Sequence, residues 1–475
     1  MTKSKSNFTL SSGQLTDWRS QFYASPMNRL AQNICAGFDP IDACRRPEQT
    51  LSLTTAVGRH FEVSNMVKPT VDGPKWICAG LDLLRQAMEP ECELSAAYLF
   101  YWHKLERSHY VLQTVANLLE RCEPLDGRTF QYVMKHLVPD GGNWQMFVNL
   151  VSKYGVMPKS CYLASWSAKR TLQLNRLLKS KLHEFSSQLH AQFTFDGDAS
   201  QLPALMERML EQLYGIINIC LGTPATEFSW KQQEQSLQLT PLAFYRRYIQ
   251  PKYALQSQLC LAHDPRTSSC YGRNYSVGYS SNMWQGLQQC YNNQPMPMLL
   301  QIMSDALSGG SPVWLACDLQ PRFKAKCQLL SLSLHSFEQL LGLPVFTPLD
   351  KATRLQYKDT GRNSVLLLTA ATLDAAQQPL YFSSQRQSAS EPSGNKTTST
   401  INLNETSVTT TTTTAKRKVS GGSGKSLTLH ADWLREYAFE IVVDARFVPP
   451  SVLHASRTQP HIELPIWDPM GALLS

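Results

Sequence analysis

The chain has 475 residues, 43% of them hydrophobic and 10% aromatic, which is typical of globular proteins. It carries 45 Lys and Arg against 37 Asp and Glu, a net charge of +8 that is moderate for this length. No apolar run approaches a membrane span, and the polar first eight residues lack the apolar core of a signal peptide. We therefore expect a soluble cytoplasmic protein that does not contact the membrane.

The twelve Cys residues are scattered singly along the chain. No CxxC pair and no zinc-finger spacing occurs among them, so the sequence indicates neither a metal site nor a redox pair. In a reducing compartment such thiols mostly act as small buried hydrophobic groups. We expect no metal and no cofactor.

Residues 1–60 form a polar tail followed by helical pieces, and residues 61–165 form a helical unit. Within this unit, a loop with Pro69, Gly73 and Pro74 leads into a helix that begins at Lys75. Apolar residues then recur at helical spacing, which predicts one buried stripe. The first residue of such a helix lies at the positive end of the helix dipole, where an enzyme would place a thiolate. Here that residue is Lys75.

Residues 166–310 are expected to be mostly helical, with two amphipathic helices over 172–193 and 205–220. From residue 311 the period shortens, and residues 312–318, 364–370 and 438–444 are predicted to be buried strands. Residues 311–382 and 426–455 form this β-rich part. The Ser-, Thr- and Gly-rich residues 383–425 between them bury too little apolar area to order, so we expect disorder there. Residues 456–475 form a C-terminal tail.

Several motifs with specific sequences follow one another along the chain. They are Ser95-Ala-Ala-Tyr-Leu-Phe-Tyr-Trp102, Asp140-Gly-Gly-Asn-Trp-Gln-Met146, Tyr291-Asn-Asn-Gln-Pro295 and Trp467-Asp-Pro-Met-Gly-Ala-Leu473. Together with Gly73, Trp76 and Ile77 they resemble, in order, segments of the bleomycin hydrolase family, papain-like cysteine aminopeptidases called aminopeptidase C in bacteria. The resemblance implies an α+β, papain-like fold with a helical half and a β-rich half. It also implies a helical insertion at 166–310, similar to the hook region that assembles the family's hexamers, and a C-terminal arm.

The resemblance assigns the family's catalytic positions to residues that cannot perform its chemistry. A papain-like hydrolase needs a Cys of lowered pKa, a His that shares its proton, a group that orients the His, and oxyanion donors. Lys75 occupies the nucleophile position, Ser364 the His position and Pro69 the position of the oxyanion Gln. The Asn of the family is lost near Ser420. We therefore expect no catalytic residue at these positions.

Three alternatives would preserve chemistry at this site. Cys78 lies one helical turn beyond Lys75 and could be a relocated nucleophile, although a buried core thiol is the simpler interpretation. Lys75 could act as an amine nucleophile through a Schiff base if its site were desolvated. A different His, such as His335 or His430, could approach in space.

Two further groups of residues are candidates for binding. The first resembles the segment that binds the substrate backbone in the family, although a plain tight turn explains its glycines equally well. It consists of Trp76, Gly141, Gly142 and Asn143. The second resembles the arm that limits cutting in active relatives to N-terminal residues, and it consists of Trp467, Met470, Leu474 and Ser475.

These observations predict a catalytically inactive, bleomycin-hydrolase-like protein that acts as a scaffold, peptide-binding protein or regulatory subunit. The expected partners are further copies of the chain in a hexamer, an active relative, or peptide N-termini. One alternative is a residual cysteine-type aminopeptidase. Another is nucleic-acid binding through a basic channel, although the basic residues are spread out except at 169–181 and 416–418.

Overall fold

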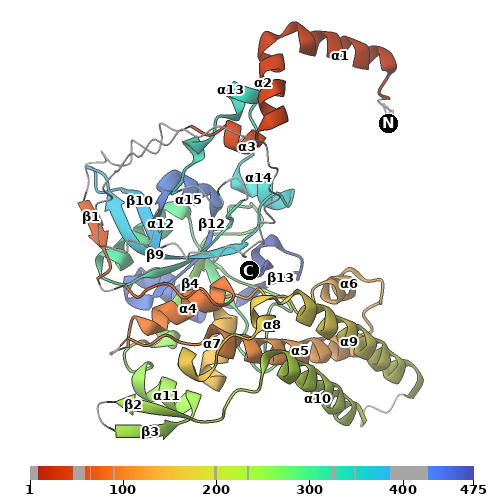
Figure 1. The fold of residues 1–475 in the computed structure, drawn as a ribbon, viewed down its shortest axis with the longest axis vertical. Coiled ribbons are helices and arrows are strands. Elements are labelled where there is room, and N and C mark those ends of the chain that lie inside the picture. Colours follow the sequence, from red (N-terminus) through yellow and green to blue (C-terminus); the bar gives the residue numbers. More distant parts are fainter. Residues whose placement is uncertain are drawn as a thin grey trace, which may run out of the picture.

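The structure is a computed structural model that describes residues 9–46, 59–64, 66–88, 91–196, 201–232, 235–320, 323, 328–346, 349–385 and 426–474. Within these ranges one large mixed sheet separates two layers of helices (Figure 1). This α+β architecture agrees with the fold class expected from the sequence. The segment 386–425, with Ser420, lies outside the described residues, as does Ser475.

The helix α4 (Lys75–Arg85) is the centre of the helical half. Trp76, Ile77, Leu81 and Leu84 have no exposed surface, which confirms the predicted buried stripe. α4 packs against α5 (Ala96–Glu120), α7 (Trp144–Tyr154) and the sheet. The other helices before residue 170 are α1 (Ser12–Ala24), α2 (Pro26–Gly37), α3 (Pro40–Ala43), α6 (Arg128–Lys135) and α8 (Trp166–Lys169).

Two long helices extend this half beyond α5. α9 (Leu172–Ala191) and α10 (Leu202–Leu221) pack against each other and against α5, at the lower right of Figure 1. Leu174, Leu178 and Leu182 follow one another at four-residue spacing and are buried, as an amphipathic helix requires. The two predicted helices are thus confirmed, and their role in assembly stays a prediction.

The main sheet runs in the order β13-β5-β6-β4-β12-β7-β9-β10-β11-β8, with β1 also paired to β9. Successive side chains of its central strand β7 (Val313–Cys317) alternate between the two cores, as the period of a strand requires. Trp314 packs on the α4 side, whereas Leu315 packs against α12 (Met296–Ser308) and α15 (Ala431–Tyr437). The other strands are β1 (Arg59–Glu62), β4 (Gln258–Ala262), β5 (Asn274–Val277), β6 (Cys290–Asn293), β8 (Leu329–Leu330), β9 (Ser364–Leu373), β10 (Pro379–Gln385), β11 (Ser426–His430), β12 (Ala438–Asp444) and β13 (His461–Leu464).

Residues 166–310 are less helical than expected. After α10 come a hairpin of β2 (Phe228–Gln232) and β3 (Gln235–Leu239), then α11 (Pro241–Tyr248), and then β4, β5 and β6 of the main sheet. β5 and β6 are four-residue strands that contain Asn and Ser, residue types that are depleted in strands or favour turns. Two of their buried polar side chains pair with each other, since Asn292 donates to Asn274 at 2.8 Å. Such buried networks leave no periodic apolar signal in the sequence.

The prediction of disorder is wrong for residues 383–385, and it stays a prediction for 386–425, which lie outside the described residues. Residues 383–385 belong to β10, which pairs with both β9 and β11. The two ladders satisfy the backbone of these polar residues, so they are ordered without a strong apolar pattern. The remaining helices of the β-rich half are α13 (Phe337–Leu341), α14 (Lys351–Gln356) and α16 (Pro450–Thr458).

The first helix stands away from the body of the molecule, whereas the second contacts α13 (Figure 1). Neither α1 nor α2 has a buried residue, and Trp18 and Met27 are among their exposed large apolar side chains. No helix in the described ranges combines the length and the apolar character that crossing a membrane requires.

Candidate functional site

A buried polar network fixes the loop that precedes α4. The backbone N–H of Thr70 donates to both carboxylate oxygens of Asp82, at 3.1 and 3.0 Å. Arg85 donates to Asp82 at 2.9 Å and to the carbonyl oxygen of Lys68 at 2.8 Å. The network therefore holds Pro69, which lies between these residues, in a fixed place. Proline has no N–H and no side-chain donor, so it offers nothing to an oxyanion.

Lys75 and Ser364 meet where the helical half contacts the sheet. Lys75 is the first residue of α4 and is exposed, whereas Ser364 is the first residue of β9 and is buried. The Lys75 ammonium (Nζ) donates a hydrogen bond to the Ser364 hydroxyl (Oγ) at 3.3 Å. The structure thus brings together the two residues that the resemblance assigns to the nucleophile and the histidine, 289 positions apart.

Cys78 is placed as a core thiol. It has no exposed surface, and its Sγ would lie 3.6 Å from a Cβ added at Gly73. Burial and the nearby carboxylates of Asp82 and Asp72 raise the pKa of the Cys78 thiol, whereas a nucleophilic thiolate requires a lowered pKa. Among the described residues, no group of three or more His, Cys, Asp or Glu is arranged to hold a metal ion.

Lys75 and the two candidate histidines lack the surroundings that catalysis would require. Lys75 is exposed, whereas an amine nucleophile needs a desolvated site. His335 stacks on Phe337, and His430 caps the N-terminus of α15. These contacts hold both histidines in parts of the β-rich half other than β9, the strand that carries Ser364.

The position of the orienting group lies outside the described residues, because it was predicted near Ser420. β10 is antiparallel to β9, and its register pairs Ser384 with Leu368. The described part of β10 ends at Gln385. On its other side Ser364 pairs with Cys317 of β7, whose buried thiol has a raised pKa.

The turn before α7 is packed directly onto α4. The indole N–H of Trp76 donates to the carbonyl oxygen of Asp140 at 2.9 Å. A Cβ at Gly142 would lie 2.5 Å from the Trp76 ring, so only glycine fits there. Asn143 is buried and caps α7 by accepting a hydrogen bond from the backbone N–H of Met146. Structural packing thus accounts for the residue types at 142 and 143.

The C-terminal arm pairs with this turn through its backbone. The N–H of Gly142 donates to the carbonyl oxygen of Leu474, and the N–H of Leu474 donates to that of Gly142, both at 2.9 Å. Leu474 has no exposed surface, and a Cβ at Gly141 would lie 2.8 Å from its carbonyl oxygen. The two groups of binding candidates predicted from the sequence are therefore brought together as an antiparallel bridge.

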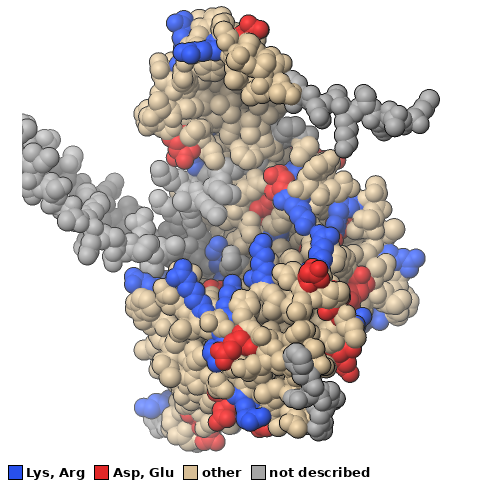
Figure 2. Space-filling model, turned by 90° about the vertical axis from the view of Figure 1, so that its right-hand side faces the viewer, with Lys and Arg blue, Asp and Glu red and all other residues tan. Residues whose placement is uncertain are grey.

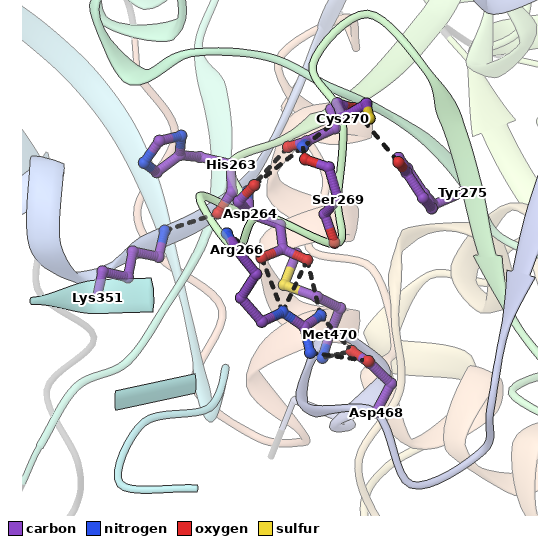
Figure 3. A network of polar contacts seen from close by, with 10 residues as sticks. His263, Asp264, Arg266, Ser269, Cys270, Tyr275, Lys351, Asp468 and Met470 are labelled. Atoms are coloured by element: carbon purple, nitrogen blue, oxygen red, sulfur yellow. Dashed lines mark hydrogen bonds and ion pairs between the residues drawn. The ribbon is translucent and has the colours of Figure 1, made fainter. Parts of the chain in front are cut away.

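Charged side chains anchor the arm before it reaches the turn. Arg266 donates to the carboxylates of Asp264 and Asp468, at 2.7 and 2.9 Å (Figure 3). Arg362 donates to the carbonyl oxygen of Ala472 at 2.7 Å and forms a buried ion pair with Glu440. Sequence reasoning missed both arginines, which lie more than 100 residues from the arm. The only signal was Asp468 in the tail motif, an acid that needs a partner when buried.

The two arm residues singled out from the sequence also make contacts. The Trp467 ring lies under the guanidinium of Arg128, 4.1 Å from its centroid, in a cation–π contact. Met470 is 1% exposed. Both residues therefore contribute to fixing the arm on the body of the protein.

A cavity with several basic side chains in its lining bears on the nucleic-acid alternative. A cavity of about 600 Å³ opens beside α6 and α9 and is lined by Arg128, Lys135, Lys179 and His183 among others. On the face drawn in Figure 2, basic side chains gather across the middle with acidic ones among them. The mixture of charges limits the electrostatic attraction that this face can exert on a polyanion.

Comparison with known proteins places this geometry in a family. A model of the Peptidase C1-like family matches residues 9–401 and 417–471. Bleomycin hydrolase from Gallus gallus is 31% identical over 466 residues, 95% of each chain, and aminopeptidase C from Listeria monocytogenes is 25% identical over 442 residues, 91% of each chain. The crystal structure of PepW from Lactobacillus rhamnosis superposes with a TM-score of 0.82 at 22% identity, covering 98% of this chain and 99% of the other, and supports the fold. The chain therefore belongs to the Peptidase C1-like family, as a relative of bleomycin hydrolase and aminopeptidase C.

Proposed function

We propose that this protein is a non-hydrolytic member of its family, a binding or regulatory subunit rather than a peptidase. The observation that carries the proposal is the 3.3 Å contact between the Lys75 ammonium and the Ser364 hydroxyl. Peptide hydrolysis of the papain type needs a thiolate and an imidazole in these two roles. An ammonium is not a nucleophile, and a serine hydroxyl does not accept a proton at neutral pH. The family activity, cysteine-type aminopeptidase, is the alternative.

The arm supports a binding role that needs no chemistry. Leu474 reaches Gly142 by two backbone hydrogen bonds, the mode in which an extended peptide adds to an existing chain. Backbone recognition of this kind depends little on the side chains of the bound segment. We propose that the segment around Gly142 holds the protein's own tail and, when the tail is displaced, the end of another peptide.

Rebuilding the missing pair tests the assignment of the two positions. We expect the thiol of the double variant Lys75→Cys/Ser364→His to react with iodoacetamide about tenfold faster near pH 6 than that of Lys75→Cys alone, because a neighbouring imidazolium lowers the pKa of a thiol. Peptide mass spectrometry measures alkylation at position 75 separately from the protein's own cysteines. The buried Cys78 in the same region serves as the internal control.

Equal reaction rates in the single and double variants would contradict the assignment, since they would show that a histidine at position 364 does not reach the thiol. The double variant is also expected to gain only slight aminopeptidase activity. Pro69 still lacks the oxyanion donor, and the loss of one such donor costs about 10²–10³ in rate.

A further inference from the structure

A second cavity is lined in part by the residue that precedes Ser364 in the chain. It has a volume of about 570 Å³, within the range of small-molecule sites, and Asn363 is part of its lining. The arm forms one wall through Trp467, Pro469 and Ala472, and the loop 358–361 forms another. The cavity is therefore complete only when the arm is in its anchored place.

A carboxylate without a counter-ion lines this cavity. Asp318 is 3% exposed and accepts hydrogen bonds from Thr360 Oγ1 and Asn363 Nδ2, both at 2.6 Å. In the described part of the chain no Lys or Arg forms an ion pair with it, and Arg354, which acts on it from further away, is paired with Glu436. Burial accordingly raises the pKa of Asp318. A buried carboxylate is normally paired with a cation, so Asp318 has hydrogen-bond donors but lacks a counter-ion among the described residues.

An unsatisfied amide oxygen lies beside it. Gln320 lines the same cavity, is 9% exposed, and its Oε1 has no hydrogen-bond partner. Its Nε2 donates to the Asp318 carboxylate at 3.4 Å. The Gln320 Oε1 and the Asp318 carboxylate, both acceptors, therefore lie next to each other. Buried polar atoms are almost always hydrogen-bonded, so an orphan acceptor in a cavity indicates a missing donor.

The charges at the rim do not supply that donor. Lys358 and Asp359 line the cavity but are both exposed, and one positive and one negative charge offset each other there. Asp468, a further acid in the lining, is already paired with Arg266. The interior thus retains one net negative charge on Asp318.

We propose that this cavity binds the cationic N–H group of a ligand, the guanidinium or ammonium of a peptide, with Asp318 and Gln320 Oε1 as its acceptors. Charge-assisted hydrogen bonds of this type are about twice as strong as neutral ones. The proposal goes beyond the proposed loss of hydrolysis and does not depend on it, because neither Lys75 nor Ser364 takes part. It names cationic N–H groups as the ligand class of a cavity whose wall is completed by the protein's own C-terminal arm.

Calorimetric titration of the full-length protein tests the proposal with three capped or simple probes. Acetyl-arginine methylamide carries a guanidinium, acetyl-citrulline methylamide is its neutral isostere, and alaninamide offers an α-ammonium. We expect the cationic probes to bind and the citrulline probe to bind at least about tenfold more weakly. The relative affinity of the two cations identifies a side chain or a chain end as the preferred source.

Three variants locate the binding. Asp318→Asn should weaken the binding of the arginine probe about tenfold, and Gln320→Met about threefold, since each removes one acceptor. The matched control Asp359→Asn removes a carboxylate from the exposed rim and should change affinity less than about twofold. If Asp318→Asn fails to fold, Gln320→Met decides alone. Equal binding of arginine and citrulline probes, no binding of either cation, or equal effects at positions 318 and 359 would each overturn the proposal.

Discussion

Replacing Arg362 by methionine is expected to lower the free energy of unfolding by about 3–5 kcal/mol. Arg362 and Glu440 form an ion pair whose side chains are 3% and 1% exposed. Removing the guanidinium leaves the Glu440 carboxylate buried without its cation, although Gln289 Nε2 still donates to it at 2.6 Å. The substitution also removes the hydrogen bond to Ala472 that holds the arm. Urea-induced unfolding at pH 7 measures the effect.

A matched control separates burial from charge. Arg435 pairs with Asp432 at 2.5 Å, but the two side chains are 48% and 54% exposed. Arg435→Met should therefore cost less than about 1 kcal/mol. Combining Arg362→Met with Glu440→Leu should recover part of the loss, because it removes the uncompensated charge. Similar losses for Arg362→Met and Arg435→Met would show that the Arg362 pair is not buried in the protein.

The protein is expected to lose stability steeply as the pH falls below about 6.5, through two buried histidines. Burial, and the neighbouring Lys104, lower the pKa of His103 to about 3, and burial and Lys351 do the same for His263. Both rings are thus neutral in the folded protein between pH 3 and 6.5, whereas in the unfolded chain they bind protons below about pH 6.5. Each contributes up to about 1.4 kcal/mol of lost stability per pH unit in that window.

Histidine variants provide the measurement. Unfolding free energies at pH 6.5, 5.5 and 4.5 should fall less steeply for His103→Gln and for His263→Gln than for the unmodified protein. Burial raises the pKa of Asp82 and Asp318, and these acids oppose the slope, so the decisive quantity is the difference between variant and parent. His461 is exposed on β13 and serves as the control. If the free energy of unfolding falls with pH as steeply in His103→Gln and in His263→Gln as in the unmodified protein, the account is contradicted.

Periodic segments of the fold could be predicted from the sequence. α4 and β12 begin at the expected residues because each buries a continuous apolar stripe or run. β5 and β6 could not be predicted, because their buried side chains include Asn274 and Asn292, which hydrogen-bond to each other across the sheet. Polar pairing of that kind depends on which strands are neighbours, and local sequence does not carry this information.

Part of the candidate site could likewise be predicted from the sequence, and part could not. The resemblance paired Lys75 with Ser364, and spacing alone could not have done so across 289 residues. The partners that anchor the arm, Arg266 and Arg362, and the unpaired Asp318 become visible only when distant segments meet. A buried charge is recognised by what surrounds it, and those surroundings are set by the tertiary structure.

Hydrolysis of fluorogenic aminoacyl amides by the purified protein, beside its Cys78→Ala variant and bleomycin hydrolase from Gallus gallus, tests the central proposal most directly. We predict turnover by the chicken enzyme alone, with the protein and its variant both at the background rate. Turnover that depends on Cys78 would contradict the account, because it would show that the nucleophile has moved one helical turn along α4. Turnover that survives in Cys78→Ala would equally contradict it and would identify Lys75 as the next residue to replace.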